Sequence, residues 1–275
     1  MYFWSITSMW NITLRELKDR KWSLLAYCLG SLALLWIYVA TFESSKNSSA
    51  QLQQLVKSYP KGILDAFGLS DININTVEIY LNAKHFSLLW PLIAIILAIS
   101  RSAGQIAGEI QTGTMGLLLS LPIDRVKIIV AKYIASIITI ATFTAVSVFG
   151  VMPLAAAYHI PTHPNILFSA WVLTSLFMWS IYSIGLAVSS VFSDKTPAYA
   201  VTSSIMIVSY VAYIVSLIND HLNSFKYYSL FHYFNTQAVL STGSIPRSSF
   251  AVFGITIVLT SSFAAWQFNR RDISV

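Results

Sequence analysis

Six long runs of apolar residues decide what this chain can fold into. About 20 apolar residues are needed for one helix to cross the hydrocarbon core of a bilayer. The runs are of that order, at approximately residues 22–42, 86–107, 133–158, 166–192, 198–218 and 250–268. Only 10% of the residues are charged, against about 25% in a soluble domain, so lipid must cover much of the surface. The sequence therefore predicts an all-α integral membrane protein, a single transmembrane domain over residues 1–275 with six spans.

The second run is the least regular of the six. Its clean apolar part, residues 86–100, is too short to cross a bilayer at about 1.5 Å per residue. We therefore expect this span to continue through Arg101 and Gln105, whose side chains would face protein, water or lipid headgroups.

Three segments outside the spans have their own patterns. Residues 1–21 predict an amphipathic helix that lies in the membrane interface, with one apolar face made of Phe3, Ile6, Trp10, Leu14 and Leu17. Charged residues occupy its other faces near the end, where Arg15–Asp19 and Glu16–Arg20 form i,i+4 pairs. The segment 43–85 predicts short helices on the outer surface. The aromatic-rich segment 219–249 predicts an amphipathic or re-entrant outer helix before the sixth span.

The basic residues indicate the orientation. With both termini inside, the inner segments hold eleven Lys and Arg and the outer segments hold six, of which four lie in the long 43–85 segment, where the positive-inside rule weakens. The sequence therefore predicts a multi-pass protein of the cell (inner or plasma) membrane with both termini in the cytoplasm. The net charge of +6 forms no basic patch with interleaved aromatics, so we expect no nucleic-acid partner.

The sequence contains no motif for catalysis or cofactor binding. It has no phosphate-binding loop, no G-x-G-x-x-G turn and no metal-binding spacing of His or Cys. Five histidines fall near the predicted outer face, and scattered interfacial histidines explain them more simply than a metal or pH-sensing site. We therefore expect a chain that is not an enzyme and that binds no cofactor itself.

Charged residues at membrane depth are few. They are Arg101, Glu109 and Lys132, all near the predicted cytoplasmic edge. The centre of the predicted bundle has no acidic residue, which argues against a transporter coupled to protons or sodium ions. This distribution favours a transporter that receives its energy from the cytoplasmic side.

Residues 104–132, GQIAGEIQTGTMGLLLSLPIDRVKIIVAK, interrupt the apolar runs with an acid, a Gly-Thr pair, a Leu-rich turn and a proline. This segment resembles the signature of the type-2 ATP-binding-cassette (ABC) exporter permeases. The tail FNRRDISV, residues 268–275, is similar to the usual ending of that family. The positions that match the signature are Glu109, Gly113, Thr114, Leu117, Leu118, Pro122, Arg125 and Lys132.

The resemblance implies that residues 109–125 form a coupling helix, which rests in a groove of a separate ATPase subunit. Its expected contact residues are Glu109, Gly113, Thr114, Leu117, Leu118, Leu119, Leu121, Pro122 and Arg125. The resemblance also implies two ATPase copies, which bind ATP and Mg²⁺, and a second permease subunit, identical or related. The second and fifth spans would line the translocation path, with Phe86, Met206, Tyr210 and Tyr213 as candidate lining residues.

Three alternatives stay open at this stage. The segment 109–125 could be a plain interfacial loop. The chain could be a non-transporting anchor or sensor subunit of an ABC-type complex. An intramembrane lipid-modifying enzyme is a third reading, although the sequence lacks the carboxylate, histidine or metal cluster that such chemistry requires. The apolar spans favour an amphipathic or apolar cargo.

Overall fold

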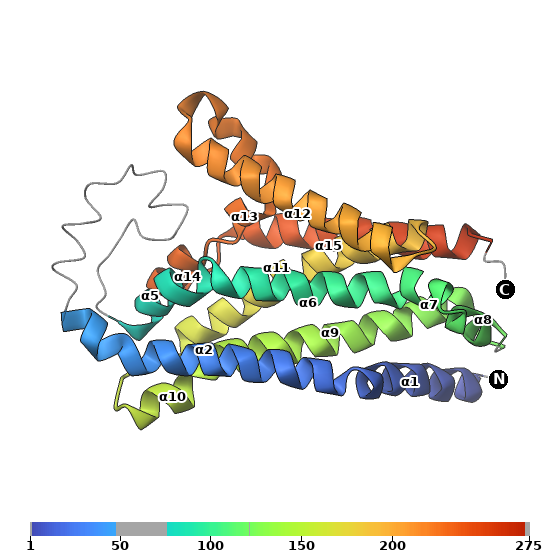
Figure 1. Ribbon diagram of the computed structural model, residues 1–275, viewed down its shortest axis with the longest axis horizontal. Helices are drawn as coiled ribbons and strands as arrows, with labels where there is room; N and C mark the ends of the chain where they lie inside the picture. Colours follow the sequence, from blue (N-terminus) through green and yellow to red (C-terminus); the bar gives the residue numbers. More distant parts are fainter. Residues whose placement is uncertain (1, 48–75, 121, 273–275) are drawn as a thin grey trace.

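The computed structural model describes residues 2–47, 76–120 and 122–272, and helices form its architecture (Figure 1). Most of the predicted outer segment 43–85, together with Leu121, lies outside the described residues. The long helices are α1 Tyr2–Asp19, α2 Lys21–Asn47, α6 Leu89–Gln105, α9 Arg125–Phe149, α11 Pro164–Val191, α12 Lys195–Ile218 and α15 Arg247–Arg270. The short ones are α5 Val77–Leu81, η1 Asn82–Phe86, α7 Ala107–Gln111, α8 Thr114–Leu119, α10 Val151–Ala157, η2 Asp220–Tyr228, α13 Leu230–Tyr233 and α14 Thr236–Thr242.

Within the described residues, five helical stretches are long and apolar enough to cross a bilayer: Lys21–Ser45, Arg125–Ala157, Pro164–Val191, Lys195–Ile218 and Arg247–Arg270. A sixth crossing is possible if the bent pair Val77–Phe86 and Leu89–Gln105 counts as one span. The predicted all-α multi-pass class is therefore confirmed.

The second predicted span differs from expectation at its start. Instead of beginning at Phe86, helical structure begins at Val77 and bends by 53° before Leu89. Pro91 explains the break, because it has no N–H to donate to Ser87 and its ring clashes with that carbonyl. The Ser87 N–H instead donates to the Asn82 carbonyl at 2.9 Å, which closes a π-type turn. Val77, Tyr80 and Leu81 are buried, so one face of α5, at the end of the segment 43–85, packs into the bundle.

Helix α11 is the centre of the bundle and packs against α6, α9 and α15. Small residues permit the closest approach. A Cβ atom at Gly185 would lie 2.1 Å from the Ser102 hydroxyl of α6, so only glycine fits there. Further along α11, the Phe177 ring stacks on Phe234 at 4.1 Å between ring centroids, and Trp90 stacks on the same ring from α6.

Both termini lie at one end of the bundle, which also carries α7 and α8 (Figure 1). We call this the termini end. The opposite end, with α5, α10 and α14, is the distal end. The predicted outer segment 219–249 lies at the distal end of α12 and is divided into η2, α13 and α14 instead of one helix. The side chains of Ser229 and Asn235 start the last two by accepting hydrogen bonds from the N–H groups of Phe231 and Ala238.

Residues Tyr2–Asp19 form a helix, but the face that packs on the protein differs from the predicted apolar face. Ile12, Thr13 and Glu16 are buried against α9, where the Thr13 hydroxyl donates to the Ala131 carbonyl at 3.0 Å. Trp10 and Leu14, from the predicted apolar face, are about half exposed at 51% and 47%. The Arg15–Asp19 pair is confirmed at 3.6 Å. The Glu16–Arg20 pair is wrong, because the Glu16 carboxylate turns inward to Lys132.

Candidate functional site: a charged pocket and an apolar groove

A tight reversal of the chain positions the segment predicted to be the coupling helix. Helix α7 ends at Gln111, and Gly113 adopts a left-handed conformation with φ of +74°, which glycine tolerates best. The Thr112 hydroxyl donates to the Gly108 carbonyl at 3.0 Å, and the Thr114 hydroxyl donates to the Glu109 carbonyl at 3.4 Å. Helix α8 therefore leaves the turn in a fixed direction at the termini end (Figure 1).

The leucines of α8 do not share one face. Leu117 is 68% exposed, whereas Leu118 and Leu119 are partly buried and pack against Met9 and Ile12 of α1 and Ile128 of α9. Successive residues on an α-helix are about 100° apart, so a run of three leucines cannot form one exposed ridge. Among the described leucines of α8 that were expected to contact the ATPase, only Leu117 is exposed. Pro122 follows α8 and is exposed.

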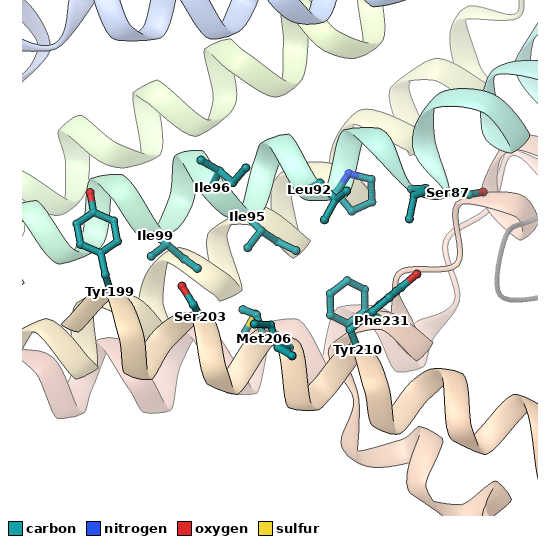
Figure 2. A pocket seen from close by; sticks show the side chains of 13 residues that line it. Ser87, Leu92, Ile95, Ile96, Ile99, Tyr199, Ser203, Met206, Tyr210 and Phe231 are labelled. Carbon is teal, nitrogen blue, oxygen red and sulfur yellow. The ribbon is translucent and has the colours of Figure 1, made fainter. Parts of the chain in front are cut away.

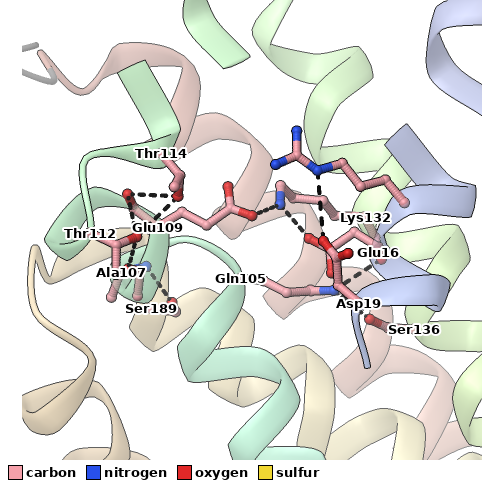
Figure 3. A network of polar contacts seen from close by, with 12 residues as sticks. Glu16, Asp19, Gln105, Ala107, Glu109, Thr112, Thr114, Lys132, Ser136 and Ser189 are labelled. Atoms are coloured by element: carbon pink, nitrogen blue, oxygen red, sulfur yellow. Dashed lines mark hydrogen bonds and ion pairs between the residues drawn. The ribbon is translucent and has the colours of Figure 1, made fainter. Parts of the chain in front are cut away.

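Lys132 joins the segment to two other helices (Figure 3). Its ammonium, on a side chain that is 3% exposed, lies 2.5 Å from a carboxylate oxygen of Glu16 on α1 and also pairs with Oε1 of Glu109 on α7. The cation that pairs with Glu109 is therefore Lys132, which also matches the family signature. Arg125 instead donates to the Arg271 carbonyl at 2.5 Å. One cation therefore holds three helices together at the termini end.

The two carboxylates do not share Lys132 equally. Burial alone would raise the pKa of Glu16, but the charge of Lys132 outweighs it and the pKa of Glu16 is lowered. Burial and the neighbouring Glu16 raise the pKa of Glu109 despite the same lysine. In addition, Oε2 of Glu109 is buried and has no hydrogen-bond partner. Glu16 stood out in the sequence only through its i,i+4 spacing to Arg20, and no local pattern indicates its contact with Lys132.

The three helices around Lys132, with α8, enclose a pocket of about 450 Å³ at the termini end. A polar network leads from this region into the bundle. The Gln105 amide donates to the Ser136 hydroxyl at 2.7 Å and accepts a hydrogen bond from Tyr182. The Arg101 guanidinium donates to the Thr139 hydroxyl at 2.5 Å. Arg101 and Gln105 were expected to face protein, water or headgroups. Both side chains are buried and therefore face protein.

A second cavity, of about 340 Å³, is a groove between α6 and α12 (Figure 2). Of the four predicted path-lining residues, Met206 and Tyr210 line it. Phe86 does not, because its ring is buried between His85 and Trp90. Tyr213 also lies outside the lining and packs near His232. The described residues that line the groove are apolar side chains with two serines and two tyrosines, and none is charged.

The described residues hold no group of three or more His, Cys, Asp or Glu that could bind a metal ion.

Comparison with known protein families shows the family of the chain. The model of the ABC-2 family transporter proteins matches residues 10–273. The chain belongs to the ABC-2 transporter family. No curated protein gave a match.

Membership of the ABC-2 family makes the chain a membrane permease of the ABC transporter class, and not an enzyme in itself. The ABC-2 match extends from the middle of α1 to beyond the end of α15. It therefore covers the pocket around Lys132 and the groove between α6 and α12 alike.

Proposed function

We propose that this chain is the permease subunit of an ATP-driven exporter, which docks a separate ATPase at its termini end and moves cargo along the groove between α6 and α12. Two permease subunits, identical or related, would work with two ATPase copies that bind ATP and Mg²⁺. The ABC-2 family match carries this proposal.

The sequence and the termini end support coupling to a separate ATPase. The sequence has no phosphate-binding loop, so its energy has to come from another subunit. Residues 109–125 would be the coupling segment, with the roles first expected for them. Leu117 is the side chain best placed to enter an ATPase groove, because it is 68% exposed on a helix whose other described leucines pack inward.

The groove supports a path for apolar or amphipathic cargo. It lies between α6 and α12, the second and fifth spans in a six-span arrangement, and its described lining bears no charge. Met206 and Tyr210 are the proposed lining residues, and the second permease subunit would close the open side. Phe86 and Tyr213 would act only as packing residues behind the path.

The basic residues support a cytoplasmic location for the termini end. Arg15, Lys18, Arg125, Lys127 and Arg270 are all part of helices at this end of the bundle. Under the positive-inside rule this supports a cytoplasmic location for both termini, α1 and α8, with the protein in the inner or plasma membrane of the cell. It also puts α8 on the side where ATP is available.

The direct test is binding of the cognate ATPase to the purified permease and to the variant Leu117→Asp. Burial of a leucine side chain contributes about 1.5–3 kcal/mol, and a carboxylate in its place adds a desolvation cost. We therefore expect Leu117→Asp to weaken the complex by roughly tenfold or more. Leu117 is a better test residue than Leu119. Leu119 packs on α1, so an aspartate there would disturb the permease itself whether or not the ATPase docks on α8.

The matched control is Tyr228→Asp, which places the same charge at an 86% exposed aromatic residue of η2, at the other end of α12. The wild-type complex and the control should hydrolyse ATP and export cargo, and the purified permease alone should not hydrolyse ATP. An ATPase that binds and hydrolyses without any export would support the anchor or sensor alternative. Normal binding by Leu117→Asp would show that the segment is an interfacial loop.

A further inference from the structure

The pocket at the termini end carries an unbalanced negative charge. Its wall contains three carboxylates, Glu16, Asp19 and Glu109, and two cations, Arg15 and Lys132. Arg15 pairs with Asp19 at the exposed rim, where both side chains are about two-thirds exposed. Lys132 has to serve both Glu16 and the partly buried Glu109. Among the residues of the pocket wall, one negative charge therefore remains without a cation of its own.

That charge is centred on Glu109. Its Oε1 pairs with Lys132, and its Oε2 is buried without a hydrogen-bond partner (Figure 3). A buried oxygen of this kind costs free energy unless a donor reaches it. Arg20 and Arg101 act on the neighbouring Glu16, whose pKa their charges help to lower. Lys127 pairs with Asp124, Arg125 donates to the Arg271 carbonyl, and Arg271 donates to the carbonyls of Ser190 and Phe192. None of these described residues donates to Oε2 of Glu109.

The pocket is also large enough for a foreign side chain. Its volume of about 450 Å³ lies in the range of pockets that hold small ligands, roughly 300–1,000 Å³. Leu117 forms part of its wall and is mostly exposed, so a protein that covers Leu117 would also cover the mouth of the pocket. Asn11 and Thr114 add neutral polar groups around the opening.

We infer that this pocket receives a lysine or arginine side chain of the ATPase subunit, which donates to Oε2 of Glu109 when the ATPase docks on α8. The inference rests on the proposed function and adds a charged contact, shared by α1 and α7, to the apolar contact of Leu117. An anionic group would be repelled by the excess carboxylate, and an apolar one would leave Oε2 unpaired. A basic side chain alone corrects both the charge and the missing hydrogen bond.

The inference is tested by the affinity of the full-length permease for its cognate ATPase, measured in nanodiscs of phosphatidylcholine and phosphatidylglycerol so that no lipid amine competes. Glu109→Gln removes the excess charge and leaves a neutral Glu16–Lys132 pair, so the free permease should unfold at the same or a higher temperature. The ATPase should nevertheless bind roughly 30-fold more weakly, because its basic side chain loses a buried charged partner. Glu43→Gln makes the same substitution at an exposed residue near the distal end of α2 and should bind as wild type.

A second variant keeps Glu109 and does not depend on its removal. Asn11→Arg, at an exposed position of the pocket wall, supplies an internal guanidinium and should exclude the ATPase side chain with a similar loss of affinity. Wild-type affinity in both Glu109→Gln and Asn11→Arg, with weak binding in Leu117→Asp, would overturn this inference and leave the proposed function standing. Wild-type affinity in all three would overturn both.

Discussion

The pocket at the termini end and the groove between α6 and α12 are of similar size but opposite chemistry. Three carboxylates and two cations line the pocket, whereas the described lining of the groove has no charge. In the pocket, carboxylates from α1 and α7 pair with one lysine of α9. The groove is built on the apolar faces of two long helices. The pocket is therefore suited to bind a charged protein surface, and the groove is suited to bind an apolar molecule.

One continuous stretch of chain joins the two regions. Helix α6 lines the groove with Leu92, Ile95 and Ile99, continues through Ile106, and becomes α7, which carries Glu109. The Ala107 N–H donates to the Ser189 hydroxyl at 3.0 Å and ties this junction to the central helix α11. A displacement of α7 by the ATPase would therefore reach the groove along α6.

The largest effect should come from the cation at the centre of the pocket. Lys132→Met leaves the buried Glu16 and the partly buried Glu109 without the cation that they share, and we expect a loss of about 3–5 kcal/mol in the free energy of unfolding of the permease. Chemical denaturation in detergent measures it. The matched control Lys127→Met removes an exposed pair with Asp124 and should cost about 0–1 kcal/mol.

Neutralising both acids should restore most of that loss, in the triple variant Lys132→Met, Glu16→Gln, Glu109→Gln. Equal losses in the free energy of unfolding for Lys132→Met and Lys127→Met would contradict the contrast drawn between the two regions. The pocket would then depend on charge no more than the open surface does.

A smaller and more selective effect should come from the groove. Met206→Trp adds volume at a residue that is 3% exposed and lines the groove, so cargo export should fall by roughly tenfold, the effect of misfit in an apolar site. Met206→Leu nearly conserves volume and should export normally. Affinity for the ATPase should stay at the wild-type value in both variants. Weaker ATPase binding in Met206→Trp would show that the two regions are not separate in function.

The sequence predicted the helical class and the approximate positions of the apolar helices, because each rests on a long local pattern. It missed the bend before Leu89, where Pro91 interrupts hydrogen bonding inside an apolar run and the pattern of hydropathy does not change. It singled out Arg101, Glu109 and Lys132 among the charged residues, and Arg101 and Lys132 are buried, but so are Glu16 and Glu78, and it paired Glu16 with Arg20 on its own helix. The true partner, Lys132, is 116 residues away, and only the packing of α1 on α9 brings them together.

The candidate sites were predictable to different degrees. Of the residues expected to line a path, Met206 and Tyr210 line the groove between α6 and α12, whereas Phe86 stacks in the aromatic core. The exposure of Leu117 relative to Leu118 and Leu119 depends on how α8 leaves the Gly113 turn. A run of three leucines contains no information about that direction.

Site-specific crosslinking tests the central claim most directly, namely that the ATPase docks at the termini end and the cargo path lies in the groove. A photoreactive benzophenone side chain would replace Leu117 in one permease and Ile207, which is 63% exposed and lines the groove, in another. Each would be assembled with the cognate ATPase in nanodiscs and irradiated. We expect a covalent ATPase adduct from position 117 and none from position 207. An adduct from position 207, or only lipid adducts from position 117, would contradict it.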